Sequence, residues 1–269
     1  MCELGPLRER REAVELVAAE ADRAQAGSGR LVLLRGASGT GRTALLEAVA
    51  AQAQTRGVRV LRARCAPDDD AVPFSAVLRL LSSETEPVHA TEPRSDHGAP
   101  SYDRTYAAQL WNRLRAYASD APLLVAVDDI HFADGSSRRW LVDAARRIDT
   151  LPLLLIVTER CQYDIDPPSE GLAHTLSPTL VRTHTLSPLS ANAAAELVRS
   201  ETGTAEQGWV DDCVRAGAGS PLLLRALLDD LRAKDPDDPL PESVPETCAA
   251  LYPGAYPAAV SWWLDSAGP

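Results

Sequence analysis

The chain has 269 residues, 45 % of them hydrophobic, which is enough for one large α/β domain or for one domain with a smaller companion. Its 27 basic and 38 acidic residues give a formal net charge of −11, so the chain as a whole repels nucleic acid and anionic lipid. The five cysteines form no Cys-x-x-Cys pair, which argues against a zinc site and a disulfide framework. No apolar run is long enough to cross a bilayer and the amino terminus is charged, so we expect a cytoplasmic protein.

Short apolar strands alternate with helices over the first 160 residues. This order predicts a parallel sheet covered by helices on both faces, with ligands bound at the carboxyl ends of the strands. Residues 82–104 lack apolar periodicity and are expected to form a surface excursion. The expected elements are, in chain order, a helix over 7–25, a strand over 31–34, a helix from 43, a strand over 58–64, helices from 73 and 106, a strand from 123 ending in two acids, a helix capped by Asp134, and a strand over 151–157.

The pattern becomes helical after about residue 170. The pentapeptide HTLSP occurs at His174 and again at His184, which we interpret as two short extended pieces ending at turns. Three helices should follow, the first of them capped by Ser190 or Asn192, and then an acidic, proline-rich linker and a terminal helix. We therefore divide the chain into an amino-terminal helix element (1–28), an α/β domain (29–170), a small helical lid domain (171–234), and a linker with the start of another segment (235–269).

The segment GASGTGRT, between a predicted strand and a predicted helix, has the pattern of a phosphate-binding P-loop. Glycines let successive backbone N–H groups point into one concavity, and the helix that follows favours negative charge there. The hydroxyl of Thr43 is placed to bind Mg²⁺. The residues expected to bind ATP or ADP in this loop are Gly36, Ser38, Gly39, Thr40, Gly41, Arg42 and Thr43.

Arg42 stands where the usual motif has lysine. Only one of the 27 basic residues is lysine, so arginine could serve as a working replacement in this chain. Alternatively the planar guanidinium binds nucleotide but misplaces the γ-phosphate, or the loop no longer binds nucleotide at all. Loss of the phosphate contacts of this residue would weaken binding by roughly 10- to 150-fold.

A pair of aspartates follows the buried strand LLVAV, as expected for a Walker B segment. Buried carboxylates are unfavourable unless something neutralises them. We expect Asp128 to hold Mg²⁺ through water and Asp129 to orient or deprotonate the attacking water, although both could simply cap the next turn. Arg160 follows the next apolar strand and could contact the γ-phosphate, or could be an ordinary surface arginine.

Seven segments in this order resemble the nucleotide-binding module of STAND-class P-loop ATPases. The resemblance is to the module of large ATP-binding LuxR-type transcriptional regulators of actinomycetes, and it covers most of residues 7–232. The matching segments are LRERREAVEL, LVLLRGASGTGRTALLEA, PFSAVLRLL, PLLVAVDDIHFADGSSRRWL, LPLLLIVTER, LSPLSANAAAEL and GAGSPLLLRALL.

The resemblance implies further contacts of a bound nucleotide. Glu9 and Arg10 are similar to a short element near the adenine, although Arg11 replaces an acid that is common there. Gly219-Ser220-Pro221 resembles a lid element whose proline, Pro221, packs against the base. Phe132 replaces a tryptophan that usually follows the histidine of the Walker B segment.

The resemblance implies an ATP/ADP-binding regulatory switch with slow or no hydrolysis, truncated before the effector-sensing and helix-turn-helix parts. We therefore expect no direct nucleic acid or membrane contact by this chain, whereas its downstream partners and any self-association stay open. Alternatives are an ATPase with steady turnover and a scaffold that has lost nucleotide binding through Arg42.

Overall fold

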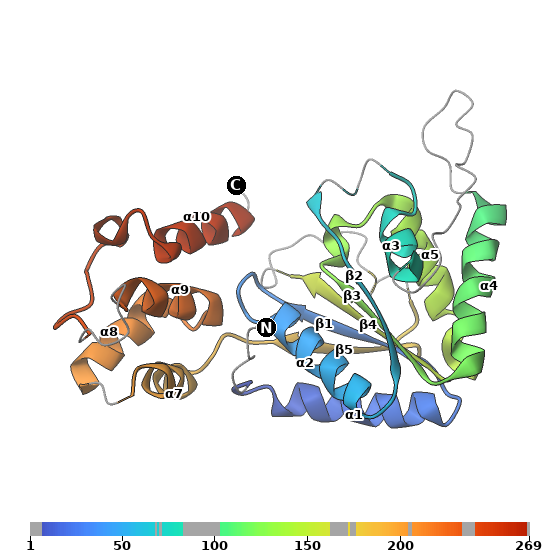
Figure 1. Cartoon of the computed structure of the whole chain (residues 1–269), viewed down its shortest axis with the longest axis horizontal. Helices are drawn as coiled ribbons and strands as arrows, with labels where there is room; N and C mark the ends of the chain where they lie inside the picture. Colours follow the sequence, from blue (N-terminus) through green and yellow to red (C-terminus); the bar gives the residue numbers. More distant parts are fainter. Residues whose placement is uncertain are drawn as a thin grey trace.

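The structure, a computed structural model, describes residues 7–67, 69, 72–82, 103–161, 172, 176–203, 206–232 and 240–267. These residues form a sheet part and a helical part that lie side by side (Figure 1). The sheet part contains five parallel strands in the order β2-β3-β4-β1-β5. The strands are β1 (Arg30–Gly36), β2 (Arg59–Arg64), β3 (Leu123–Asp128), β4 (Leu153–Arg160) and β5 (Val181–Leu186).

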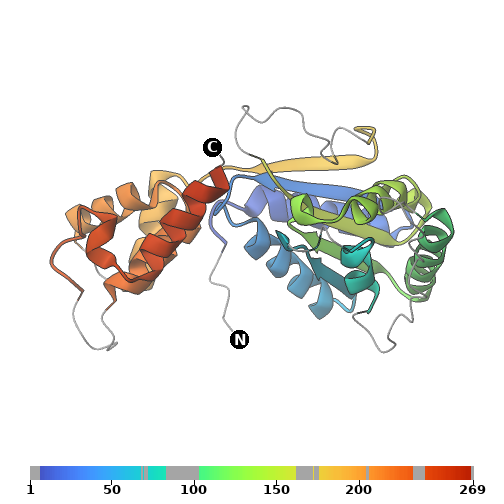
Figure 2. The same cartoon turned by 90° about the horizontal axis from the view of Figure 1, so that it is seen from above.

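Helices cover both faces of the sheet, as the sequence predicts (Figure 2). Side chains alternate between faces along a strand, so Leu31 and Leu33 of β1 pack in one apolar cluster and Val32 and Leu34 in the other. The helices α1 (Arg11–Gln25) and α2 (Arg42–Thr55) cover the second face. The first face is covered by α3 (Ser75–Ser82), α4 (Arg104–Asp120) and α5 (Gly135–Ala145), with the short 3₁₀ helices η2 (Ile130–Phe132) and η3 (Ile148–Thr150) in the connections.

Two of the helices on the first face, α4 and α5, begin at an aspartate that caps them. Asp103 accepts hydrogen bonds from the backbone N–H groups of Thr105 and Tyr106 at the start of α4. The expected cap at Asp134 is confirmed, because its carboxylate accepts from the N–H of Ser137. The expected surface excursion lies almost entirely in residues 83–102, which are outside the described residues, as is His174 of the first HTLSP copy.

The sheet extends further along the chain than residue 170, where the sequence-based division ends the α/β domain. β5 pairs with β1 in parallel register, from Leu31 opposite Val181 to Gly36 opposite Leu186. It is an edge strand whose outer residues stay partly exposed. The second HTLSP copy therefore contributes His184 to the sheet, and the polypeptide enters the helical part only after Leu186.

The helical part has its own apolar cluster, built from α7 (Ala191–Thr202), α8 (Gln207–Gly217) and α9 (Pro221–Leu231). Ser190 rather than Asn192 caps α7. After η5 (Cys248–Leu251), the last helix α10 (Ala255–Ala267) lies on α9, and Asp230 accepts hydrogen bonds from the first two N–H groups of α10. Trp262 of α10 is 53 % exposed. Within the described residues, no helix combines the length and apolar character that a membrane span requires.

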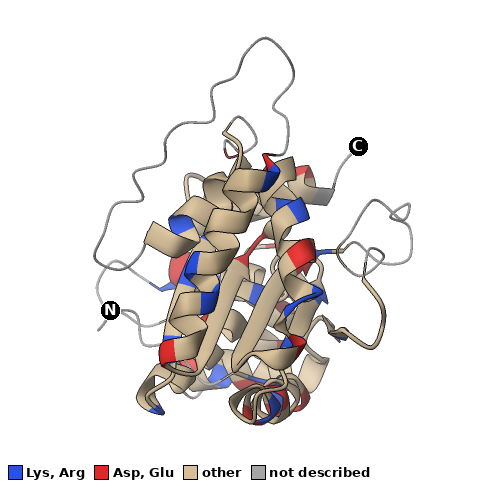
Figure 3. Cartoon of the chain, turned by 90° about the vertical axis from the view of Figure 1, so that its right-hand side faces the viewer, with Lys and Arg blue, Asp and Glu red and all other residues tan. Residues whose placement is uncertain are grey.

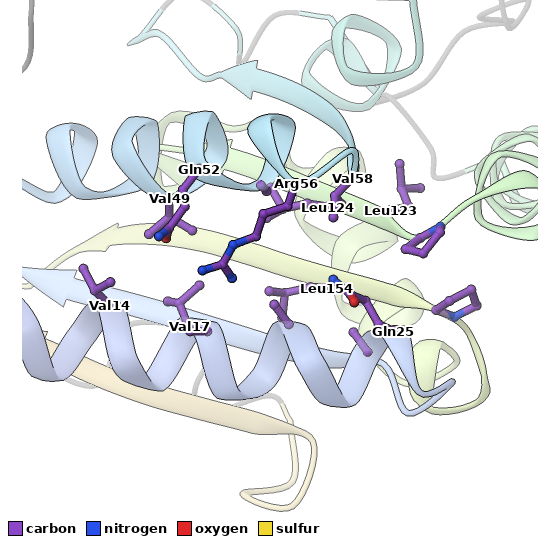
Figure 4. A pocket seen from close by; sticks show the side chains of 16 residues that line it. Val14, Val17, Gln25, Val49, Gln52, Arg56, Val58, Leu123, Leu124 and Leu154 are labelled. Carbon is purple, nitrogen blue, oxygen red and sulfur yellow. The ribbon is translucent and has the colours of Figure 1, made fainter.

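A small hollow of about 40 Å³ lies between α1 and α2, near the amino-terminal ends of β3 and β4 (Figure 4). Val14 and Val17 of α1 face Val49 of α2 across it, and the side chain of Arg56 extends into the space between the two helices. The phosphate loop lies at the opposite, carboxyl ends of the strands. The hollow is therefore a feature of core packing and not part of the site described next.

Candidate functional site

The loop between β1 and α2 has the backbone shape that the glycine pattern predicts. Gly39 and Gly41 have φ values of +80° and +92°, a conformation that L-residues with side chains rarely adopt. A Cβ atom at Gly36 would lie 2.7 Å from the hydroxyl oxygen of Thr40, so this position also requires glycine. Thr40 donates from its hydroxyl to the carbonyl oxygen of Ala37, which closes the turn ahead of the first residues of α2. The N-terminus of α2 thus faces the concavity and favours an anion there.

The guanidinium of Arg42 is turned back into this loop. One nitrogen donates to the carbonyl oxygen of Gly36 at 2.9 Å, and the other lies 3.3 Å from a carboxylate oxygen of Asp129. Only 8 % of the residue is exposed, and this burial lowers the pKa of Arg42 from its ordinary value while the nearby acids oppose the shift. A phosphate group would therefore compete for Arg42 with partners that the residue already has.

The two acids differ in their surroundings. Asp128, at the end of β3, accepts hydrogen bonds from the hydroxyls of Thr43 (2.8 Å) and Thr158. Asp129 has a left-handed backbone conformation with φ 53°, and its N–H donates to the Thr158 hydroxyl at 2.7 Å. Burial, and then the charge of Asp128, raise the pKa of Asp129 above its ordinary value. Asp128, a predicted Mg²⁺ ligand, thus lies against Thr43, and Asp129, the predicted base, lies against Arg42.

Sequence reasoning missed Thr158, which holds both acids in place. The sequence could have indicated it, because Thr158 is the single hydroxyl residue at the end of the apolar run of β4, the strand next to β3. Arg64, at the end of β2, was also missed, and it lies 3.8 Å from Asp128 and 4.0 Å from Asp129. Thr158 and Arg64 reach the acids because the strand order brings the carboxyl ends of β2, β3 and β4 together.

Arg160 and His131 line the cleft in front of the phosphate loop. Arg160 ends β4, directly beside Gly36 in the sheet register. His131 stacks against Phe132 with ring centroids 4.1 Å apart, and its buried Nδ1 atom has no hydrogen-bond partner among the described residues. Burial, and then the charges of Arg42, Arg160 and Arg138, lower the pKa of His131 to about 4. The imidazole is therefore neutral at physiological pH, and the sequence analysis assigned it no role.

The helical part contacts the phosphate loop through the first residues of α9. The hydroxyl of Ser220 caps this helix and also donates to the carbonyl oxygen of Gly39 at 3.3 Å. The N–H of Leu222 reaches the same carbonyl at 3.4 Å. Pro221, between them in the sequence, lines the cleft, and its contact with a base stays a prediction.

Arg10 lies at the joint between the two parts of the chain rather than open to the main cleft. Its guanidinium donates to the carbonyl oxygens of Thr40 and Ser187, each at 2.9 Å, and the residue is 6 % exposed. Glu9 accepts from the N–H and the hydroxyl of Ser190. Arg10 and Thr40 also line a second hollow of about 50 Å³, which includes Pro221 and lies beside the main cleft. The contact of Arg10 with a base stays a prediction, and this smaller hollow is where such a contact would lie.

The main cleft has a volume of about 620 Å³, within the range of small-molecule sites. It is bounded by the phosphate loop, the acids, and helices α9 and α10. Among the sequence-predicted residues, Asp128, Gly36 and Thr40 lie behind this surface, and Arg10 lies to one side. The predicted residues that line it are Ser38, Gly39, Gly41, Arg42, Thr43, Asp129, Arg160 and Pro221, and Arg64, Arg225, Trp262 and Asp265 join them.

The comparisons with known proteins agree with this fold and loop. Residues 6–157, more than half of the chain, match the family described as the AAA ATPase domain. The chain therefore belongs to the AAA ATPase domain family, a nucleotide-binding class with a P-loop fold.

Among curated proteins, an uncharacterized protein of Rhizobium meliloti (strain 1021) is 26 % identical over 198 residues, which are 59 % of this chain and 19 % of that protein. Solved structures with a similar fold include Orc1 of Aeropyrum pernix in complex with DNA (TM-score 0.57, 18 % identity, 96 % of this chain and 66 % of that one). AMPPCP-bound DnaA of Aquifex aeolicus is another (TM-score 0.54, 14 % identity, 84 % of this chain and 61 % of that one). The chain thus spans about a fifth of its curated relative and under two thirds of these structures, which share its fold.

Proposed function

We propose that this AAA ATPase domain is an ATP/ADP-binding regulatory switch, of the STAND class found in LuxR-type transcriptional regulators. One observation carries the proposal: the carbonyl of Gly39, inside the phosphate loop, accepts hydrogen bonds from Ser220 and Leu222 of the helical part. A phosphate bound in the loop acts directly on the joint between the two parts. ATP and ADP then favour different positions of the helical lid, which we place after β5.

The residues present fit a magnesium ion. Thr43 offers a hydroxyl and Asp128 a carboxylate, 2.8 Å apart, and Mg²⁺ prefers oxygen ligands together with nucleotide phosphates and water. Within the described residues there is no cluster of three or more His, Cys, Asp or Glu side chains that would hold a metal without these additional ligands. When bound, Mg²⁺ would screen the charge of the phosphates.

The chain's own residues supply the remaining functions in this proposal. Arg42 leaves the carbonyl of Gly36 to pair with the β- and γ-phosphates, and Arg160 contacts the γ-phosphate from the end of β4. Asp129, once released from Arg42, accepts a proton from, or orients, the attacking water. Because Arg42 must be displaced from Asp129 first, we expect hydrolysis to be slow.

Titration of labelled ATP and ADP against the purified chain, with and without Mg²⁺, tests this proposal. We expect saturable binding of both nucleotides and Mg²⁺-dependent binding of ATP. Phosphate release should be slow and should fall to background in Asp129→Asn. Absence of saturable binding at millimolar nucleotide would overturn the switch, whereas fast release that Asp129→Asn abolishes would favour an ATPase with steady turnover.

A second candidate function, a scaffold without nucleotide, is favoured by one observation. Arg42 is fully engaged with Gly36 and Asp129, so the loop is closed by its own residues. The variant Arg42→Lys separates the two functions, because lysine makes a different set of contacts with the loop and with phosphate. Binding that appears only in Arg42→Lys would support the scaffold, and binding by the unmodified chain would exclude it.

A further inference from the structure

A groove of about 370 Å³ lies on the outer surface between α4 and α5, separate from the nucleotide cleft. Its floor is formed by Ala107, Trp140 and Ala144, and the indole N–H of Trp140 donates to the carbonyl oxygen of Ala107 at 3.0 Å across it. This bond holds the two helices in register beneath the groove. The groove is therefore built on rigid, packed elements, and its volume lies within the range of ligand sites.

The walls of the groove are basic. Three arginines line the groove, Arg104 from α4, Arg139 from α5 and Arg147 after α5, together with one acid, Asp143. Figure 3 faces this side of the molecule with its arginines in blue. Residues 104–120 and 135–147 contain seven arginines and two aspartates, although the whole chain carries a net charge of −11. Of these residues, three arginines and one aspartate line the groove, and this excess of positive charge favours an anionic partner.

Two of the three arginines in this groove are not paired with a carboxylate of any residue that the structure describes. Within the described residues, neither Arg104 nor Arg147 forms an ion pair. The guanidinium of Arg147 instead lies over the ring of Trp111, 5.8 Å from its centroid. Trp111 is only partly buried and lines the groove, so the site offers an indole beside Arg147, with Arg104 at a distance along α4.

The spacing of these groups indicates the ligand. Arg104 and Trp111 are seven residues apart on α4, which is about 10 Å along a helix axis, and because Arg147 lies over Trp111 this rise also separates Arg104 from the Arg147 end of the groove. A polyproline II segment repeats every three residues and about 9 Å, so carboxylates at positions i and i+3 face the same side at nearly this spacing. A proline ring next to the carboxylate that pairs with Arg147 would pack on the exposed part of Trp111, as in other grooves that bind such segments. The alanines of the floor leave room for the backbone to approach.

We infer that the α4–α5 groove binds an acidic, proline-containing segment of a partner protein, with two carboxylates three residues apart that reach Arg104 and Arg147. The first carboxylate pairs with Arg104 and the second with Arg147, each able to accept two parallel hydrogen bonds from a guanidinium. The segment's proline ring lies against Trp111. This site is independent of the nucleotide proposal, because none of its residues lines the nucleotide cleft.

Fluorescence anisotropy with a labelled peptide containing Glu-Pro-Pro-Glu tests the inference on the full chain. We expect saturable binding that weakens as salt rises, and weaker binding of the matched Gln-Pro-Pro-Gln peptide, by about 10- to 25-fold, since it lacks both ion pairs. Each of Arg104→Gln and Arg147→Gln should weaken binding by about 3- to 5-fold, and the pair by about 10- to 25-fold, because the ion pairs are exposed. Trp111→Ala should weaken binding, and Trp111→Phe should restore most of it.

Arg115→Gln is the matched control, because Arg115 is exposed on α4 but does not line the groove. Arg104→Lys and Arg147→Lys keep the charge but lose the paired hydrogen bonds, so they should bind more weakly than the unmodified chain and more tightly than the glutamine variants. Equal thermal midpoints show that every variant folds. Equal binding of the glutamine peptide, or an equal loss in Arg115→Gln, would overturn the inference. The inference would also be overturned if a single-stranded oligonucleotide bound more tightly than the peptide and lost binding in the same arginine variants. The groove would then be a nucleic acid site.

Discussion

The sheet part and the helical part of this chain are each held together by apolar packing, but they are joined to one another by polar contacts. The two faces of the sheet and the helical part have three separate apolar clusters. Between the parts lie hydrogen bonds: Arg10 to Ser187, Ser190 to Glu9, and Ser220 to Gly39. Moving one part relative to the other therefore breaks a few hydrogen bonds and opens neither core.

This difference indicates where a conformational change is least costly. Two positions of the helical part can differ by only a few kcal/mol, a range in which a bound ligand can decide between them. A change within either apolar core would cost more, because interiors are close-packed. The predictions that follow test whether the polar joint has the few strong contacts that this argument requires.

The largest effect is expected at Arg10, which connects the two parts from inside. Arg10→Met keeps much of the side-chain volume but leaves the carbonyls of Thr40 and Ser187 without their donor, so we expect the free energy of unfolding to fall by about 3 kcal/mol. Urea titration followed by circular dichroism measures this. Arg11→Met, at a residue whose side chain is 90 % exposed, is the control and should change little. A loss below about 1 kcal/mol in Arg10→Met would show that the joint does not depend on this residue.

The next effect is expected at Gly39, where the phosphate loop meets α9. Gly39→Ala places a Cβ atom 2.5 Å from the hydroxyl oxygen of Ser220 and adds backbone strain at φ +80°, so we expect a loss of about 2–3 kcal/mol. Gly27→Ala is a matched control, because Gly27 has φ +83° and nothing within 4 Å of the added atom. The control should lose about 1 kcal/mol, from strain alone. Equal losses would mean that the contact between Ser220 and Gly39 carries no stability.

A pH effect should come from His131, inside the cleft. Its pKa is lowered from 6.5 to about 4 in the folded chain, so the unfolded chain binds more protons between these values. The stability that depends on neutral His131 is complete above pH 6.5 and is lost as pH falls towards 4. Allowing for partial exposure, we expect about 2 kcal/mol over this window. His131→Gln should flatten that part of the curve of unfolding free energy against pH, and an unchanged slope would contradict the assignment.

Features that depend on neighbouring residues were predictable from the sequence. The glycines of the phosphate loop and the caps at Asp134 and Ser190 follow from local backbone chemistry, and all three agree with the structure. The parallel sheet followed from alternating strands and helices. The paired acids were predictable because aspartates at the end of a buried strand require partners.

Features that depend on strand order or on distant pairing were not predictable. β5 is an edge strand with a weak apolar pattern, so only its pairing with β1 shows that it belongs to the sheet. Thr158 meets the acids because β4 lies next to β3. Arg10 bonds a residue 177 positions away, and no local pattern encodes that contact. The α4–α5 groove likewise arises because the two helices that flank β3 in the chain lie on the same face of the sheet.

The smallest effect is expected at the ion pair between Arg8 and Glu196, which also joins the two parts, with a distance of 2.8 Å. The Glu196 side chain is 64 % exposed, so solvent screens the pair and ordering two long side chains offsets much of its attraction. We expect Glu196→Gln to change the free energy of unfolding by less than about 0.5 kcal/mol, measured by the same urea titration. A larger loss would mean that exposed ion pairs stabilise the joint between the two parts. The buried hydrogen bonds alone would then no longer explain how the two parts are held together.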